Sequence, residues 1–255
     1  MILKDSIIQA YLQHIPINTA KHYSLLQNLT TPDDNRIEIV KELYHRLIEM
    51  LEQFPIFNQE LWNALFPDWK TILKDVCILP VVGLTSSIEP IQIIDNTTYI
   101  VIDLIQTANY TRIVSQMEYL LQNLLMNSFS EICINAYYPL KPNNYIQTLD
   151  HIFFKEGLKT YLSWNKDCNQ YVFQDEKYIK RKELTFAFLY DAIHIEDKNI
   201  QKNILQHIKK ANFWDQFPLI AGLFFFDDVY QKEGIEGITS IYQKGPDNIV
   251  FSIFQ

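Results

Sequence analysis

A periodic stretch near the middle of the chain, residues 111–127 (TRIVSQMEYLLQNLLMN), constrains the fold more than any other segment. At about 100° per residue its apolar side chains fall on one helical face, whereas polar side chains such as Gln116 and Asn123 fall on the other. A helix with this pattern buries its apolar stripe against a core. Glu118 lies at the border of the stripe, where a carboxylate either reaches solvent or has a specific functional role. The stretch therefore predicts a central amphipathic helix.

Glu156 is a more unusual carboxylate, because it projects into the middle of the apolar stripe of a helix expected at 144–163. An unpaired acid in such a place is costly, so it should acquire a cation, a metal ion or a proton. The sequence leaves open whether Glu156 forms a buried ion pair or is protonated.

The composition excludes several classes of function. With 255 residues, 48% of them hydrophobic, the chain can bury a substantial core without help. A net charge of −8 with no basic stripe argues against nucleic acid as a partner. Six glycines, with no Walker loop, GxGxxG or GxSxG motif, argue against a phosphate cradle or a serine-hydrolase elbow.

Cysteine usage and hydropathy bear on localisation. Cys77, Cys133 and Cys168 are odd in number and widely spaced, which fits buried thiols in a reducing compartment. No window reaches the roughly 18 apolar residues of a membrane span. Lys4 and Asp5 interrupt the first apolar pattern, which is therefore read as an amphipathic helix and not as a signal peptide. We expect a soluble, cytoplasmic protein without a membrane partner.

The hydrophobic period changes from helical to extended at Val76. Residues 1–75 are helical in pattern, with a helix start at Thr31-Pro32. Three segments that follow are rich in β-forming residues and bounded by turn residues: 76–85, 90–94 and 97–105. Asp95-Asn96 predicts a tight hairpin, and prolines at 80 and 90 place their strands at edges or bulges. We predict an α+β fold, mostly helical, with a small, mainly antiparallel sheet before the central helix.

The remainder of the chain is again helical in pattern. A loop is expected at 131–142, and a possible strand ends the chain at 249–254. Helices are expected at 175–194, 197–210, 218–232 and 235–242. The chain then comprises a helical N-terminal region, 1–75, and a second region, 76–255, in one continuous structural unit.

Other charged clusters give weaker signals. None of the six histidines pairs with another at i,i+4, so no helical metal-ligand pair is present. The one basic run, Lys177–Glu183 (KYIKRKE), is flanked by acids and is interpreted as a solvated face. The acidic cluster at 194–197 is interpreted as a solvated helix cap.

Five segments from Val76 onward occur in an order that is informative about the fold. The β-rich stretch leads into Met117-Glu118-Tyr119-Leu120-Leu121, and KEGLKTYLS follows at 155–163. AGLFFF at 221–226 then leads to YQKEGI at 230–235. Over residues 76–242 this order resembles the gluzincin-type zinc metallopeptidases, in particular the bacterial predicted zinc proteases with a short sheet, an HExxH helix and a later EG helix.

The resemblance implies a role for four positions. Glu118 occupies the position of the general base, and Glu156 that of the third zinc ligand. The two histidine positions hold Met117 and Leu121. Leucine has no donor atom and a thioether suits softer metals, so neither is a plausible Zn²⁺ ligand. The resemblance thus predicts a zincin-like fold that has lost zinc binding and peptidase activity and needs no cofactor.

Three functions are compatible with this sequence. The first is binding of a peptide or protein partner along the sheet edge at 90–94, since strand addition needs no metal. The second is a metal-independent hydrolase that uses Glu118 and Glu156 as an acid/base pair. The third is an unrelated helical interaction protein, in which residues 1–75 carry the function.

Overall fold

A computed structural model describes residues 1–26, 29–54, 56–86, 89–110, 113–139, 143–164, 173 and 175–254. The chain forms two compact units. Unit one comprises Met1–Ile56 and Asp68–Phe129, and unit two comprises Phe57–Pro67 and Ser130–Gln255. This division differs from the regions 1–75 and 76–255 expected from the sequence, because the first strand of the chain pairs within the same sheet as residues 77–81.

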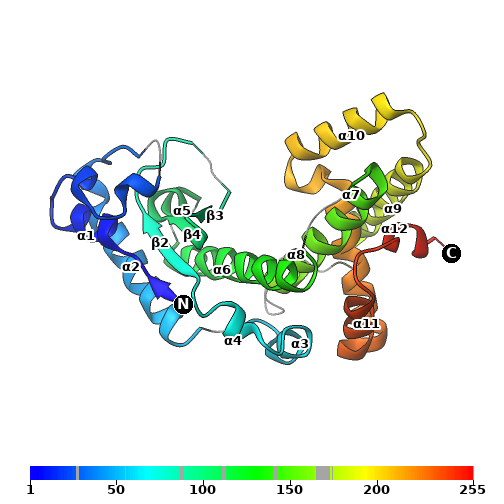
Figure 1. Ribbon diagram of the computed structural model, residues 1–255, viewed down its shortest axis with the longest axis horizontal. Coiled ribbons are helices and arrows are strands. Elements are labelled where there is room, and N and C mark those ends of the chain that lie inside the picture. Colours follow the sequence, from blue (N-terminus) through cyan, green and yellow to red (C-terminus); the bar gives the residue numbers. More distant parts are fainter. Residues whose placement is uncertain are drawn as a thin grey trace. The chain divides into compact units, whose positions relative to one another are not determined.

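Unit one contains a four-stranded mixed sheet in the order β1-β2-β4-β3 (Figure 1). Its strands are β1 (Ile2–Leu3), β2 (Cys77–Val81), β3 (Ile91–Ile94) and β4 (Thr97–Asp103). β2 is parallel to both β1 and β4, and only β3 is antiparallel to its neighbour in this sheet. The α+β class is confirmed, but the expected mainly antiparallel sheet is wrong. The two-residue β1 is too short to show a period, and β2 pairs with β4 and not with its sequence neighbour β3.

The turn signal and the edge position expected from Pro90 are confirmed, whereas the edge or bulge expected from Pro80 is wrong, because β2 is an interior strand of the sheet. Asp95 and Asn96 both have positive φ, 47° and 60°, as a tight two-residue hairpin requires. Pro90 immediately precedes β3, the edge strand. Pro80 lies in β2 beyond the end of β1, whose last hydrogen bond runs from the Lys4 N–H to the Ile78 carbonyl. A residue without an N–H is therefore tolerated there.

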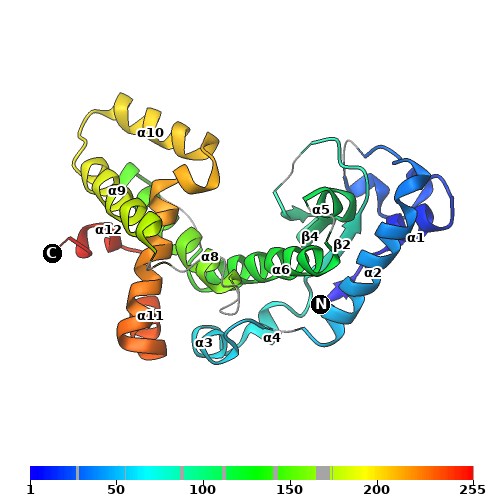
Figure 2. The same cartoon turned by 180° about the vertical axis from the view of Figure 1, so that it is seen from behind.

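Helices cover the sheet in unit one (Figure 2). They are α1 (Ser6–Leu12), α2 (Ile37–Glu52), α4 (Trp69–Ile72), α5 (Leu104–Tyr110) and the first part of α6 (Val114–Tyr137), with the 3₁₀ turns η1 (Ile17–Thr19), η2 (Tyr23–Leu25) and η3 (Asp34–Arg36). In α2, Val40, Leu43 and Leu47 are fully buried at helical spacing. The amphipathic patterns within residues 6–52 thus correspond to helices of the unit that contains the sheet, whereas Ile2–Leu3 is a strand and Gln59–Leu65 is a helix of unit two.

Helix α6 is the predicted central helix, although Thr111 and Arg112 lie outside the described residues. It continues to Tyr137, so the loop expected from residue 131 is wrong up to that point. Cys133 and Ile134 are fully buried, and burial of these side chains favours continued helix. The helix ends shortly before Pro139, in line with the restriction that proline places on the residue before it.

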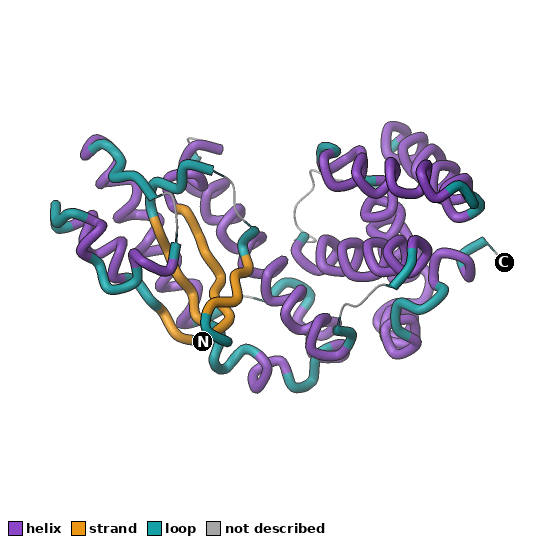
Figure 3. The backbone as a smooth tube through the Cα atoms, turned by 45° about the horizontal axis from the view of Figure 1, so that its top comes forward, coloured by secondary structure: helices purple, strands orange, loops and turns teal. Residues whose placement is uncertain are grey.

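Unit two is helical throughout its described part (Figure 3). Its elements are α3 (Gln59–Leu65), α7 (Tyr145–His151), the π-helical η4 (Ile152–Glu156), α8 (Gly157–Ser163), α9 (Glu176–Ile193), α10 (Lys198–Lys210), η5 (Phe213–Asp215), α11 (Phe217–Lys244) and α12 (Ile249–Ser252). Helix α11 packs against α3, η4, α8 and α9 and so forms the centre of the unit. Gly234 interrupts it with φ 63°, which is the break predicted between 218–232 and 235–242.

The C-terminus differs from the sequence-based expectation. The possible strand at 249–254 is wrong, because α12 occupies Ile249–Ser252. The buried carboxylate of Asp150 accepts hydrogen bonds from the backbone N–H groups of Asn248, at 3.1 Å, and Val250, at 2.9 Å. These bonds fix the first turn of α12 from another helix, which a local sequence pattern does not contain.

Two further expectations concern membranes and thiols. Among the described helices, none has the length and apolar character needed to cross a membrane. Cys77 and Cys133 are buried free thiols, whereas Cys168 lies outside the described residues. Burial raises the pKa of Cys133 to about 12, so this thiol stays protonated and unreactive at neutral pH.

Asp103 connects the sheet to α5, and its replacement gives a first test of the fold. Its carboxylate accepts backbone N–H bonds from Leu84 at 2.7 Å, Ile105 at 2.8 Å and Gln106 at 3.0 Å. We expect Asp103→Ala to lower the free energy of unfolding by about 2 kcal/mol, because it removes a helix cap and leaves buried donors without an acceptor. Urea denaturation measures this. Asp197→Ala, which removes an exposed cap from α10, is the matched control and should cost about 1 kcal/mol; equal losses would contradict the assigned role of Asp103.

Candidate functional site

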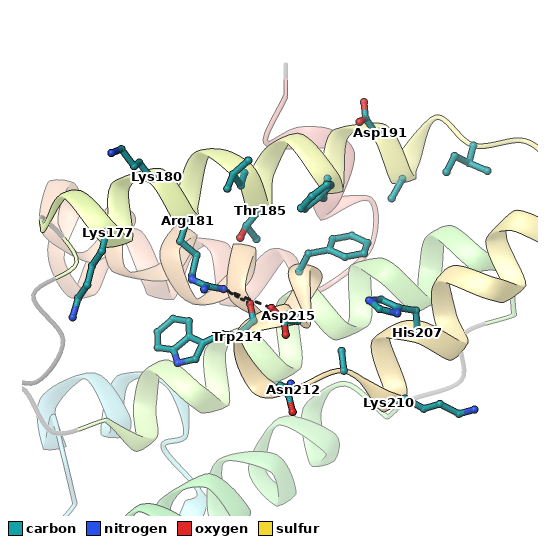
Figure 4. A pocket seen from close by; sticks show the side chains of 16 residues that line it. Lys177, Lys180, Arg181, Thr185, Asp191, His207, Lys210, Asn212, Trp214 and Asp215 are labelled. Carbon is teal, nitrogen blue, oxygen red and sulfur yellow. Dashed lines mark hydrogen bonds and ion pairs between the residues drawn. The ribbon is translucent and has the colours of Figure 1, made fainter.

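A groove of about 900 Å³ lies along α9 in unit two (Figure 4). One stripe of α9 forms its first wall, through residues spaced by three or four positions: Lys177, Arg181, Leu184, Phe188 and Ala192. The second wall comes from the end of α10, with His207 and Lys210, and from η5, with Trp214 and Asp215. Its volume is in the range of known ligand sites.

The α9 wall of the groove exposes large apolar side chains. Leu184 is 59% exposed and Phe188 is 58% exposed, whereas Leu189 on the same helix is fully buried. Phe217 and Ile195 extend the apolar surface. Single exposed apolar residues need no explanation, but adjacent ones in a concavity are typical of an interaction surface.

The rim of the groove is mainly cationic. Its charged residues are four cations and two acids: Lys177, Lys180, Arg181, Lys210, Asp191 and Asp215. The whole chain, by contrast, has a net charge of −8. Positive charge is therefore concentrated at the groove, where it can attract an acidic partner.

Arg181 is the rim cation that contacts η5. Its Nη1 donates to the Trp214 carbonyl at 2.8 Å, and its guanidinium stacks 5.4 Å from the centre of the Trp214 ring (Figure 4). Asp215 lies 3.9 Å away. These contacts hold the side chain between α9 and η5, so part of the groove wall is already arranged in the free protein.

The α6 positions that the resemblance assigns to zinc chemistry lie either in the core of unit one or in a partly exposed ion pair. Met117 is 3% exposed and Leu121 is fully buried, so both contribute to the core of unit one. Glu118 is about half-exposed and forms an ion pair with Arg46 at 3.5 Å. Within the described residues, no three His, Cys, Asp or Glu side chains are grouped so that they could hold a metal ion.

Glu156 lies in a charged cluster of unit two. It forms ion pairs there, which is one of the two alternatives that the sequence left open. Its carboxylate is 2.6 Å from the Lys159 ammonium and 3.8 Å from that of Lys155. Both lysines also contact Glu131, at 2.7 Å and 2.8 Å, and both are almost completely buried. Glu156 and Glu118 belong to different units, and each has cationic partners of its own.

Electrostatics in this cluster favours the charged forms. Burial alone would raise the pKa of Glu131, but Lys159 and Lys155 outweigh it, and the pKa lies below its ordinary value. Burial would likewise lower the pKa of Lys159, but Glu156 and Glu131 raise it above its ordinary value. The nearby His151 is buried, and burial lowers its pKa to about 4, so it is neutral at pH 7.

The π-helical segment η4 positions Lys155 within the charged cluster. In this wide turn the consecutive residues Phe153, Phe154 and Lys155 are all buried, which a regular α-helical face does not allow. Lys155 can therefore point at Glu131 on α6 from within an apolar surface. The sequence pattern predicts a loop at Glu131 and carries no local signal for its role in this cluster.

The groove was also missed, although one signal pointed to it. Three residues of the basic run Lys177–Glu183 line it: Lys177, Lys180 and Arg181. The interpretation of the run as a solvated face holds for Lys180, which pairs with Glu176 at the surface. On one stripe of α9, charged side chains alternate with apolar side chains that are exposed in the structure. This alternation was the feature of the sequence that pointed to the groove.

No family model, curated protein or solved structure matches this chain. The zinc-peptidase resemblance is therefore still a prediction that depends on its motifs. The function has to be argued from the chemistry of the groove itself.

Proposed function

We propose that this protein is a binding protein whose α9 groove holds an amphipathic helix of a protein partner, with acidic residues beside its apolar face. The proposal keeps the peptide or protein partner expected from the sequence and places it in the groove. The observation that carries it is the combination of exposed Leu184 and Phe188 with a cationic rim in an otherwise acidic chain.

The dimensions of the groove suit a helical segment. The wall formed by α9 extends from Lys177 to Ala192, and a helix of that length spans about 22 Å. Helix-in-groove recognition places apolar residues at i, i+3, i+4 and i+7 against an apolar floor. Acidic residues on the flanks of such a helix would meet the rim cations.

A nucleic acid fits the same surface less well. Asp191 and Asp215 line the groove and would repel phosphates. The α9 wall offers Leu184 and Phe188 to an apolar partner, and the chain lacks the basic stripe of a nucleic-acid-binding protein. The acid/base alternative with Glu118 and Glu156 is disfavoured by their ion pairs, because a general base must be available to take a proton.

The edge strand β3 is a second candidate surface for a peptide. Ile93 is 75% exposed on this strand, and β3 pairs on one side with β4. The register leaves the backbone groups of Ile91 and Ile93 facing away from β4, since Pro90 accepts the N–H of Val101. Strand addition there would need no side-chain chemistry.

Fluorescence anisotropy with an acidic probe peptide tests the proposal. The probe is a labelled helical peptide of about 15 residues, about 22 Å long, with leucine at i, i+3, i+4 and i+7 and glutamate on both flanks. We expect Phe188→Ser and Lys177→Glu each to raise the Kd about tenfold, by loss of apolar contact and by charge repulsion respectively. The effect of Lys177→Glu should shrink as salt is added.

Two exposed residues outside the groove lining serve as matched controls. Tyr190→Ser removes an aromatic side chain from α9, and Lys198→Glu reverses a charge on α10. Both should leave the Kd within about twofold of the wild-type value. An unchanged Kd for Phe188→Ser, or equal losses for Lys177→Glu and Lys198→Glu, would overturn the proposal.

A further inference from the structure

A second cavity, of about 500 Å³, lies on another stripe of α9, between this helix and α11. Its apolar walls are Phe173, Phe186, Phe224 and Ile179. Its charged residues are Asp227 and Asp228 from α11 and Lys182 and Glu183 from α9. The helix thus presents a cationic groove on one side and a cavity with an acidic lining on another.

Asp227 is the unusual group in this cavity. It is 9% exposed, and within the described residues the one hydrogen bond to its carboxylate comes from the Gln231 amide, at a long 3.4 Å. Burial raises its pKa above the ordinary value and Asp228 acts in the same direction, whereas the Gln231 amide and the Lys182 ammonium act against them. The Lys182 ammonium donates to Asp228, so its charge is already engaged there. A buried carboxylate with so little support gains most from a cation.

The aromatic walls select the kind of cation. Phe173 and Phe224 pack edge to face, with ring centres 5.3 Å apart, beside the carboxylate-bearing helix. Aromatic faces attract ammonium groups and also bury hydrocarbon. A Ca²⁺ or Mg²⁺ ion would need six or more oxygen ligands, and the lining offers three carboxylates, one of which is already bonded to Lys182.

We propose that this cavity binds a primary ammonium group on a hydrocarbon chain, with the ammonium at the Asp227 carboxylate and the chain along the apolar walls formed by the phenylalanine side chains. The ammonium would donate hydrogen bonds to the carboxylate oxygens, which have one long bond in the free protein. The same chemistry occurs in free alkylamines and in lysine side chains of proteins.

Isothermal titration calorimetry with three probes of equal chain length tests the cavity: hexylamine, 1-hexanol and hexanoate. We expect hexylamine to bind at least tenfold more tightly than 1-hexanol and hexanoate to bind most weakly. Nα-acetyl-lysine methylamide distinguishes the sources, because a site for free amines prefers hexylamine and a site for a lysine side chain binds the lysine derivative at least as well. Absence of binding by both amines would overturn the proposal.

Asp227→Asn is the decisive variant, because it keeps the shape of the side chain and removes its charge. We expect it to weaken hexylamine at least tenfold and to leave 1-hexanol unchanged, which also shows that the cavity is intact. Asp191→Asn, on the groove side of α9, should leave both affinities unchanged. Hexylamine should also bind more weakly as the pH falls through the raised pKa of Asp227, since the protonated acid has no charge to offer. Equal hexylamine affinity for Asp227→Asn and the wild type would overturn the assignment.

Discussion

Gly222→Ala is expected to lower the free energy of unfolding of unit two by about 3 kcal/mol or more. Helices α8 and α11 meet at Gly157 and Gly222, and a Cβ added to Gly222 would lie 2.0 Å from the Phe153 carbonyl oxygen. That atom belongs to the backbone of η4, so it cannot rotate away as a flexible side chain could. The helices would have to separate, and the core that both of them bury would lose packing contacts.

Gly234→Ala in the same helix is the matched control for this variant. Gly234 has φ 63°, so alanine is strained there, but its Cβ would meet no atom within 4 Å. We expect a loss of about 1 kcal/mol. Urea denaturation followed by circular dichroism measures both variants. A loss for Gly222→Ala no larger than that for Gly234→Ala would mean that α8 and α11 do not approach as closely as described.

Glu131→Gln is expected to cost about 3 kcal/mol, because it removes the acid shared by two buried lysines. Lys155 is 6% exposed at its side chain and Lys159 is 12% exposed, so neither can turn to water. Glu156 would then be the remaining acid for both within the described cluster, at 3.8 Å from Lys155. Glu176→Gln breaks a pair of similar length on the surface of α9 and should cost less than about 0.5 kcal/mol. Equal losses for the two variants would contradict the burial of the cluster.

The same cluster predicts how stability depends on pH. Glu131 has a lowered pKa in the folded state, so its contribution is present above the unfolded value of about 4.3 and is lost as the pH falls through the folded pKa. Lys159 has a raised pKa, so its contribution is present below the unfolded value of about 10.4 and is lost as the pH rises through the folded pKa. In Glu131→Gln both losses should be smaller than in the wild type, and urea midpoints at acidic, neutral and alkaline pH measure them.

The local features of the fold could be predicted from the sequence. The helix expected after Thr31-Pro32 corresponds to α2, although α2 begins only at Ile37, and Asp95-Asn96 indicated the hairpin, because both signals depend on a few neighbouring residues. The features that were wrong depend on distant partners. β1 is two residues long and exists because β2 pairs with it, and α12 starts where Asp150 of another helix binds its first N–H groups.

The candidate site shows the same limit. The cations of α9 were visible in the run Lys177–Glu183, but their function depends on α10 and η5, which supply Lys210 and Trp214 to the opposite wall. The sequence indicated that Glu156 needs a partner, and two partners lie nearby in the chain, three residues ahead and one residue back. Glu131, which completes that cluster, is 25 positions earlier in the chain and could not be inferred from local spacing.

Hydrogen–deuterium exchange of the full chain, with and without the acidic probe peptide, tests the proposed binding function most directly. At saturating peptide, slower exchange is expected in α9 and in residues 207–217, with no change in the edge strand at 91–94. Protection confined to 91–94 would instead place the peptide on the sheet edge. Unchanged exchange throughout α9 would contradict the proposal that this groove is the binding site.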